Sequence, residues 1–172
     1  MKRNFESLPI SKSKTMLKLK DWSPVFNISL DLTVTKYDTL HRRNIFHFTD
    51  LKNNGIDVDR LPAMWLNEDE KIEICYSTSE DRYFCRNYHV DLNKKYHIAI
   101  QQKDEILNFY INDDSHFEMI ANVNNTNSNL FKNIVVFTSN PWDLPFSSEY
   151  GSVTNFIISS EFTIESKHFH VH

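Results

Sequence analysis

The sequence predicts an all-β protein built from antiparallel strands in two packed layers. Short segments of alternating apolar and polar residues recur along most of the chain, and no stretch of ten or more residues shows a helical apolar period. Only 2 glycines and 5 prolines occur among the 172 residues, so Asn, Asp, Ser and Lys must form most of the turns. About ten to twelve short strands without crossover helices are typical of an antiparallel sandwich or barrel.

The clearest strand covers 26–34, where every second residue is apolar and the residues between are polar. Such a strand has one buried and one solvated face. Further strands are predicted at 44–49, 61–66, 71–76, 83–90, 96–101, 107–112, 134–137, 153–158 and 162–164, and a loop at 122–129. The residues expected between the two sheets include Phe26, Ile28, Leu30, Ile98, Ile100, Phe109, Ile111 and Val136.

Composition excludes several functions. The net charge is −4 with acids and bases interspersed, so no basic stripe is present and no nucleic-acid partner is expected. The sequence contains no run of 18 apolar residues, so no membrane insertion is expected. The segment 1–20 carries six lysines and arginines but no apolar stretch, so it is not a signal peptide. Scarce glycine argues against a phosphate-binding loop.

Three stretches resemble laminin G-like domains of the concanavalin A-like class. They are Leu92–Ile100 (LNKKYHIAI), Asn108–Asp113 (NFYIND) and Gly151–Ile158 (GSVTNFII). Two positions depart from the usual pattern, because Asp114 stands where a turn glycine is common and Tyr96 stands in place of tryptophan. The predicted fold is therefore an all-β, antiparallel two-sheet jelly-roll sandwich.

The resemblance implies an extracellular recognition module that binds glycans or proteins, sometimes with calcium at the rim of a sheet. The sandwich domain is expected at 17–165, preceded by an N-terminal segment at 1–16 and followed by a histidine-containing tail at 166–172. The expected location is outside the cell, either secreted or at the cell surface.

The two cysteines, Cys75 and Cys85, lie in neighbouring predicted strands joined by a polar turn. An even cysteine count in a β-rich chain favours a disulfide and an oxidising compartment. The alternative is a pair of free thiols in a cytosolic protein.

Two sites match the acceptor pattern for N-glycosylation, at Asn27 on the polar face of its strand and at Asn124 in the predicted loop. Chance matches are common in a chain so rich in Asn and Ser, so both remain hypotheses.

The histidines and carboxylates are the candidate metal ligands and catalytic groups of the sequence. His168, His170 and His172 alternate at the C-terminus, but no carboxylate or cysteine accompanies them, so no metal site is expected. A glycosidase of this fold class needs two carboxylates placed across a sugar. The run 68–70 predicts a solvated turn, and Glu73 has no second acid on its strand, so we expect no catalytic pair and no enzyme.

The segment Asn140–Phe146 is the strongest candidate for a binding loop, because two prolines stiffen a stretch that holds a tryptophan and an aspartate. A stiff loop loses less entropy on binding. Trp142 and Phe146 are candidates for stacking on a sugar or anchoring a protein, and Asp143 for binding a hydroxyl or calcium. The alternative is that Trp142 closes one end of the sandwich.

The sequence thus predicts a lectin-like or adhesion-like binding module with a glycan or protein ligand. A glycoside-active enzyme of the same fold and a structural interaction domain are the alternatives.

Overall fold

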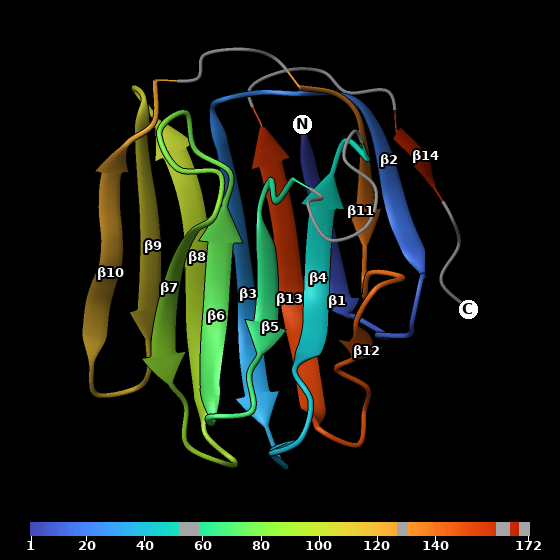
Figure 1. The fold of residues 1–172 in the computed structure, drawn as a ribbon, viewed down its shortest axis with the longest axis vertical. Helices are drawn as coiled ribbons and strands as arrows, with labels where there is room; N and C mark the ends of the chain where they lie inside the picture. Colours follow the sequence, from blue (N-terminus) through green and yellow to red (C-terminus); the bar gives the residue numbers. More distant parts are fainter. Residues whose placement is uncertain (52–58, 127–130, 161–165, 169–172) are drawn as a thin grey trace.

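The computed structural model describes residues 1–51, 59–126, 131–160 and 166–168, and these form two antiparallel β-sheets packed face to face (Figure 1). Sheet I has six strands in the order β1-β13-β3-β8-β9-β10. Sheet II runs β14-β2-β11-β4-β5-β6-β7, and the short strand β12 pairs in parallel with β4. The predicted all-β, two-sheet sandwich is therefore confirmed.

The strands of sheet I are β1 (Lys2–Ser7), β3 (Phe26–Val34), β8 (Lys95–Lys103), β9 (Ile106–Asn112), β10 (Phe117–Asn124) and β13 (Gly151–Ser160). The strands of sheet II are β2 (Thr15–Trp22), β4 (Arg43–Thr49), β5 (Ala63–Leu66), β6 (Lys71–Tyr76), β7 (Phe84–His89), β11 (Phe131–Phe137), β12 (Leu144–Pro145) and β14 (Ser166–His168). No helix long and apolar enough to cross a membrane occurs among the described residues.

The space between the sheets is filled by one apolar core to which both sheets contribute. Aromatic rings from the two layers meet there: Trp22 of β2 packs on Phe26 of β3 at 5.0 Å between ring centroids, and Phe46 of β4 packs on Phe156 of β13 at 5.4 Å. All eight residues that the sequence placed in this core are at most 4% exposed. Period-two alternation predicted them correctly because each faces the opposite sheet.

The cysteines lie on adjacent strands of sheet II and form a disulfide. Strands β6 and β7 pair so that Cys75 and Cys85 stand directly opposite each other. Their side chains point away from the main core, on the outer face of the sheet, where they pack with Ala63 and Trp65.

Several strands have weaker sequence signals and were not predicted, namely β1, β2, β10, β12 and β14. The loop expected at 122–129 is wrong at its start, because β10 continues to Asn124. Strand β10 is an edge strand whose side chains are mostly exposed, so it lacks the alternation that marks a half-buried strand. Strands β1 and β14 lie in the two segments that flank the expected domain, and they pair with β13 and β2. The strand predicted at 162–164 lies outside the described residues.

Gly151 has a physical reason to open strand β13. Its φ is +154°, and a Cβ at this position would lie 2.0 Å from the carbonyl oxygen of Thr33. The start of β13 therefore approaches β3 too closely for any side chain. This close approach accounts for the glycine in the stretch GSVTNFII.

Candidate functional site

The outer face of sheet II carries a second, smaller layer of packed side chains. Alternation along β4 and β5 turns His47 and Trp65 away from the core, yet they are only 3% and 1% exposed. The loop after β11 covers them, because it returns across the sheet before β12 pairs with β4. We call Arg42, His47, Trp65, Asn140 and Asp143 the outer cluster.

The structure separates the three predicted ligand-binding residues. Trp142 and Asp143 lie together over β4 and β5, and Trp142 is 37% exposed. Phe146 is 1% exposed and belongs to the core between the sheets, so its ring is not available to a ligand. We therefore leave Phe146 out of the candidate site.

Asn140 holds the loop in its shape. Its side-chain oxygen accepts hydrogen bonds from the backbone nitrogens of Trp142 (3.0 Å) and Asp143 (2.8 Å), which closes a local turn. Its backbone nitrogen donates to the side chain of Asn44 at 2.7 Å, and that amide is itself bound to the carbonyls of Phe46 and Met64. The loop is thus anchored to the centre of sheet II by a buried polar network.

His47 is a neutral, structural member of the outer cluster. Its Nδ1 accepts a hydrogen bond from the Asn140 amide at 3.0 Å, so the proton lies on Nε2, which donates to the carbonyl of Asp59 at 3.0 Å. Burial lowers the pKa of His47 from 6.5 to about 4, although the bond to Asp59 opposes this shift. The imidazole supports Trp142, whose ring meets it edge to face at 5.8 Å between centroids.

Trp65 and Asp143 join the loop to the strands. The indole nitrogen of Trp65 donates to Asp143 Oδ2 at 2.8 Å, and the Asn140 amide donates to the same oxygen at 2.9 Å. Arg42 lies over the Trp65 ring at 4.3 Å and pairs with Asp143 Oδ1 at 3.3 Å. Burial raises the pKa of Asp143, but the hydrogen bonds from Asn140 and Trp65 and the charge of Arg42 outweigh it, so the net shift is downward.

A second guanidinium lies on the same ring. Arg60 is half-buried, 4.9 Å above the Trp65 ring and 5.2 Å from the ring of Tyr83. Its Nη1 is 3.8 Å from Cys85 Sγ, so the disulfide forms part of the floor beneath it. Two cations thus flank a buried indole, and both are partly open to solvent.

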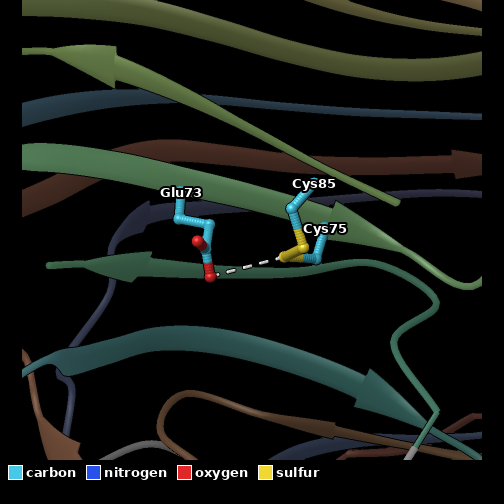
Figure 2. Close-up of side chains that lie close together, drawn as sticks. All are labelled: Glu73, Cys75 and Cys85. Carbon is cyan, nitrogen blue, oxygen red and sulfur yellow. Dashed lines mark hydrogen bonds between the residues drawn. A yellow bond between two sulfur atoms is a disulfide. The ribbon is translucent and has the colours of Figure 1, made fainter. Parts of the chain in front are cut away.

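The disulfide also bears on metal binding. Figure 2 shows the Glu73 side chain extending toward Cys75 and Cys85, with one ligand-type atom from each residue lying within 4.8 Å of the others. The two sulfurs are bonded to each other and offer no thiolate, so the group does not fit a transition metal. The contact of 3.6 Å between Glu73 Oε1 and Cys75 Sγ is a van der Waals approach, because a disulfide sulfur carries no proton.

Calcium does not fit the outer cluster either. Calcium takes six to eight oxygen ligands, with carboxylates contributing free lone pairs. Asp143 gives one oxygen to Arg42 and the other to Trp65 and Asn140. Glu73 pairs with the same Arg42 at 3.5 Å and accepts a hydrogen bond from Asn67. An arginine between the two acids occupies the place that a cation ligand would need.

The same contacts bear on catalysis. The fold brings Glu73 and Asp143 together on Arg42, although they are distant in sequence. A glycosidase needs one of its two carboxyl groups protonated near neutral pH, which requires a raised pKa. The pKa of Asp143 is lowered instead, and every hydrogen bond to it favours the ionised form. This pair is therefore better suited to fixing arginine than to transferring a proton.

The remaining predicted sites lie elsewhere. Asn27 is half-buried in the central strand β3, between Gln101 and Ser159, and Asn124 is exposed at the end of β10. Glycosylation of either stays a prediction. His168 ends strand β14, and His170 and His172 lie outside the described residues.

Sequence reasoning missed Arg42, His47, Arg60 and Trp65 as members of the site. Trp65 and His47 sit between core residues in apolar strands, and the period-two pattern does carry a signal that they face outward. Arg42 and Arg60 precede strands by one and three positions and carry no motif.

Comparison with known proteins supports the fold. No protein-family model and no curated protein sequence matches the chain. Among solved structures, the calcium-bound exoplasmic/lumenal domain of VIP36 aligns over 99% of this chain and 90% of its own length, with a TM-score of 0.53 and 10% identity. The sialidase of Trypanosoma rangeli in complex with sialic acid aligns over 78% of this chain with a TM-score of 0.50 and 12% identity.

The chain spans only 20% of that sialidase. The carbohydrate-binding module CBM66 from Bacillus subtilis covers 96% of the chain at 9% identity, with a TM-score of 0.42. Identities this low speak only to architecture. The chain is an antiparallel two-sheet sandwich, as the sequence predicted.

Proposed function

We propose that this domain is an extracellular binding module that holds a glycan on the outer face of sheet II. The observation that carries the proposal is Trp142, an aromatic ring 37% exposed on a loop that is otherwise fixed by buried hydrogen bonds. An exposed ring on a rigid support stacks on a sugar with little loss of entropy. Arg42 and Arg60 lie over the ring of Trp65 on the same face of the sheet and supply donors for sugar oxygens.

The floor of the site is rigid. The ring of Trp142 also packs on Phe137 of β11, at 6.1 Å between centroids, so two strands support it from below. Such pre-organisation is typical of binding sites whose residues are set by neighbouring packing. The disulfide, the laminin G-like resemblance and the concanavalin A-like fold support an extracellular or lumenal setting.

The test is a glycan array probed with the disulfide-bonded protein, in calcium and in a chelator. We expect binding that is unchanged by the chelator, because the acids of the outer cluster are committed to Arg42. Amide chemical shifts should then move around Trp142 and Arg60 when a hit is titrated. Shifts confined to sheet I, or an array without hits, would contradict the proposal.

A protein ligand is the second candidate, and one observation favours it. Phe117 and Met119 on edge strand β10 are 62% and 46% exposed, and the Phe117 ring stacks on Tyr110 at 5.6 Å. Exposed apolar side chains that gather in this way are a feature of protein interfaces. This patch belongs to sheet I, so substitution of Phe117 separates the two candidates: it should abolish protein binding and leave glycan binding unchanged.

A further inference from the structure

Arg60 is a charged group without a counter-charge in the part of the chain that the structure describes. Its guanidinium contacts two aromatic rings and one disulfide sulfur, and no carboxylate oxygen of a described residue lies within ion-pairing distance. Burial lowers the pKa of Arg60, and the nearby charge of Arg42 adds to this effect. Arginine nevertheless stays protonated at neutral pH, so a half-buried positive charge faces the surface of the site.

The acids of this face pair with other arginines, and the charges of Glu73 and Asp143 act on Arg60 only from a distance. Asp143 and Glu73 share Arg42, at 3.3 and 3.5 Å, and Asp59 pairs with Arg82 at 2.8 Å. Glu73 and Asp143 thus share one arginine, and none of the three carboxylates pairs directly with Arg60. Arg60 therefore keeps N–H donors that no carboxylate of the described residues accepts.

We propose that the glycan bound at this face carries a carboxylate, and that Arg60 is the residue that binds it. This inference rests on the proposed function and names its ligand class. A guanidinium presents paired N–H groups whose geometry matches the two oxygens of a carboxylate. The aromatic ring below Arg60 stacks on the planar guanidinium and limits its motion, so the pairing loses little side-chain entropy.

The position of Arg60 relative to Trp142 suits this role. Trp142 lies over His47 of β4, and Arg60 lies between Trp65 of β5 and Cys85 of β7. The two are thus separated by about two strand spacings, roughly 10 Å. A sugar ring on Trp142 and an acid group on Arg60 then belong to neighbouring parts of one oligosaccharide.

The experiment compares sugars that differ only in charge. The probes are trigalacturonic acid against its methyl ester, and 3′-sialyllactose against the methyl ester of its sialic acid, titrated by calorimetry. The wild type should bind the acidic member of a pair roughly ten- to hundredfold more tightly, as expected for a charged hydrogen-bonded pair. This preference should shrink as salt is raised, because part of it is Coulombic.

The variants are Arg60→Gln and Arg60→Lys. Arg60→Gln should remove the preference for the acid and leave binding of the neutral member unchanged, whereas Arg60→Lys should retain part of the preference through charge alone. The matched control is Arg86→Gln, which removes an exposed arginine that lies over the core residue Phe84 at 4.3 Å. It should behave as the wild type. Melting of each variant checks that the fold persists, and Arg60→Lys provides the result if Arg60→Gln fails to fold.

The outcomes separate the two proposals. Equal binding of acidic and neutral sugars, or a preference that survives Arg60→Gln, would overturn the assignment of a carboxylated ligand while leaving glycan binding in place. Failure of all four probes together with an empty glycan array would overturn the proposed function, and the role of Arg60 with it.

Discussion

The outer faces of the two sheets are organised differently. On sheet I, the residues of β8 alternate simply between buried and solvated positions, and the polar groups form surface contacts such as the 2.8 Å pair of His97 and Asp31. On sheet II, the outward residues His47 and Trp65 are as buried as the core, because a loop and two arginines cover them. An outward-facing residue is thus not always a surface residue, and the covered face is the one that we propose binds a ligand.

Because the outward residues of sheet II are buried, truncation of Trp65 should destabilise the protein as much as a core mutation. Trp65→Ala removes a ring that is 1% exposed and leaves Asp143 without its indole donor, so we expect a loss of about 3–5 kcal/mol in the free energy of unfolding. Tyr110→Ala on the outer face of sheet I should cost less than about 1 kcal/mol. Urea denaturation measures both, and similar small values would erase the contrast.

The core between the sheets provides the reference for that comparison. Ile98 of β8 is 0% exposed, so Ile98→Ala should cost about 2–5 kcal/mol by the same denaturation. A cost below about 0.5 kcal/mol would mean that the core-facing side of β8 is assigned incorrectly.

The burial of His47 should make the stability of the protein depend on pH. The folded-state pKa of His47 is about 4, against 6.5 when unfolded, so the unfolded chain binds more protons between these values and stability falls as the pH falls through this range. This single group accounts for about 3 kcal/mol lost by pH 4. The acids of the protein contribute their own pH dependence, so the quantity to measure is the difference between the wild type and His47→Gln.

The stability of the wild type relative to His47→Gln should fall by about 3 kcal/mol from pH 7 to pH 4, since His47→Gln cannot be protonated and lacks this loss. His97→Gln on the outer face of sheet I is the matched control, because His97 is half-exposed. Parallel stability curves for the wild type and His47→Gln would show that His47 is not held neutral by burial.

The sequence predicted the fold well where each strand has one buried face. Strands β3, β6, β8 and β9 were found within one or two residues at each end, and the Cys75–Cys85 bridge followed from the hairpin that carries it. Strand β10 was missed, because an exposed edge strand lacks alternation. Alternation of apolar and polar residues reports which way a side chain faces relative to its neighbours. It gives no signal where both faces of a strand are solvated.

The candidate site was predicted only in part. The stiff loop around Trp142 and Asp143 was recognised from its prolines, but Phe146 was grouped with them although it lies in the core. Arg42, Arg60 and Trp65 reach the site from other segments, 78 positions separating Trp65 from Asp143. Their meeting depends on strand order in sheet II, which local sequence patterns do not determine.

The central claim is that the outer face of sheet II, and not that of sheet I, binds the glycan. The most direct measurement is affinity and melting temperature determined together for Trp142→Ala and for Tyr110→Ala, with a glycan that binds the wild type. We expect Trp142→Ala to lose about 2 kcal/mol of binding free energy or more, roughly thirtyfold in affinity, with little change in melting, and Tyr110→Ala to bind as the wild type does. A well-folded Trp142→Ala protein with unchanged affinity, or a loss of binding that only follows unfolding, would contradict the account.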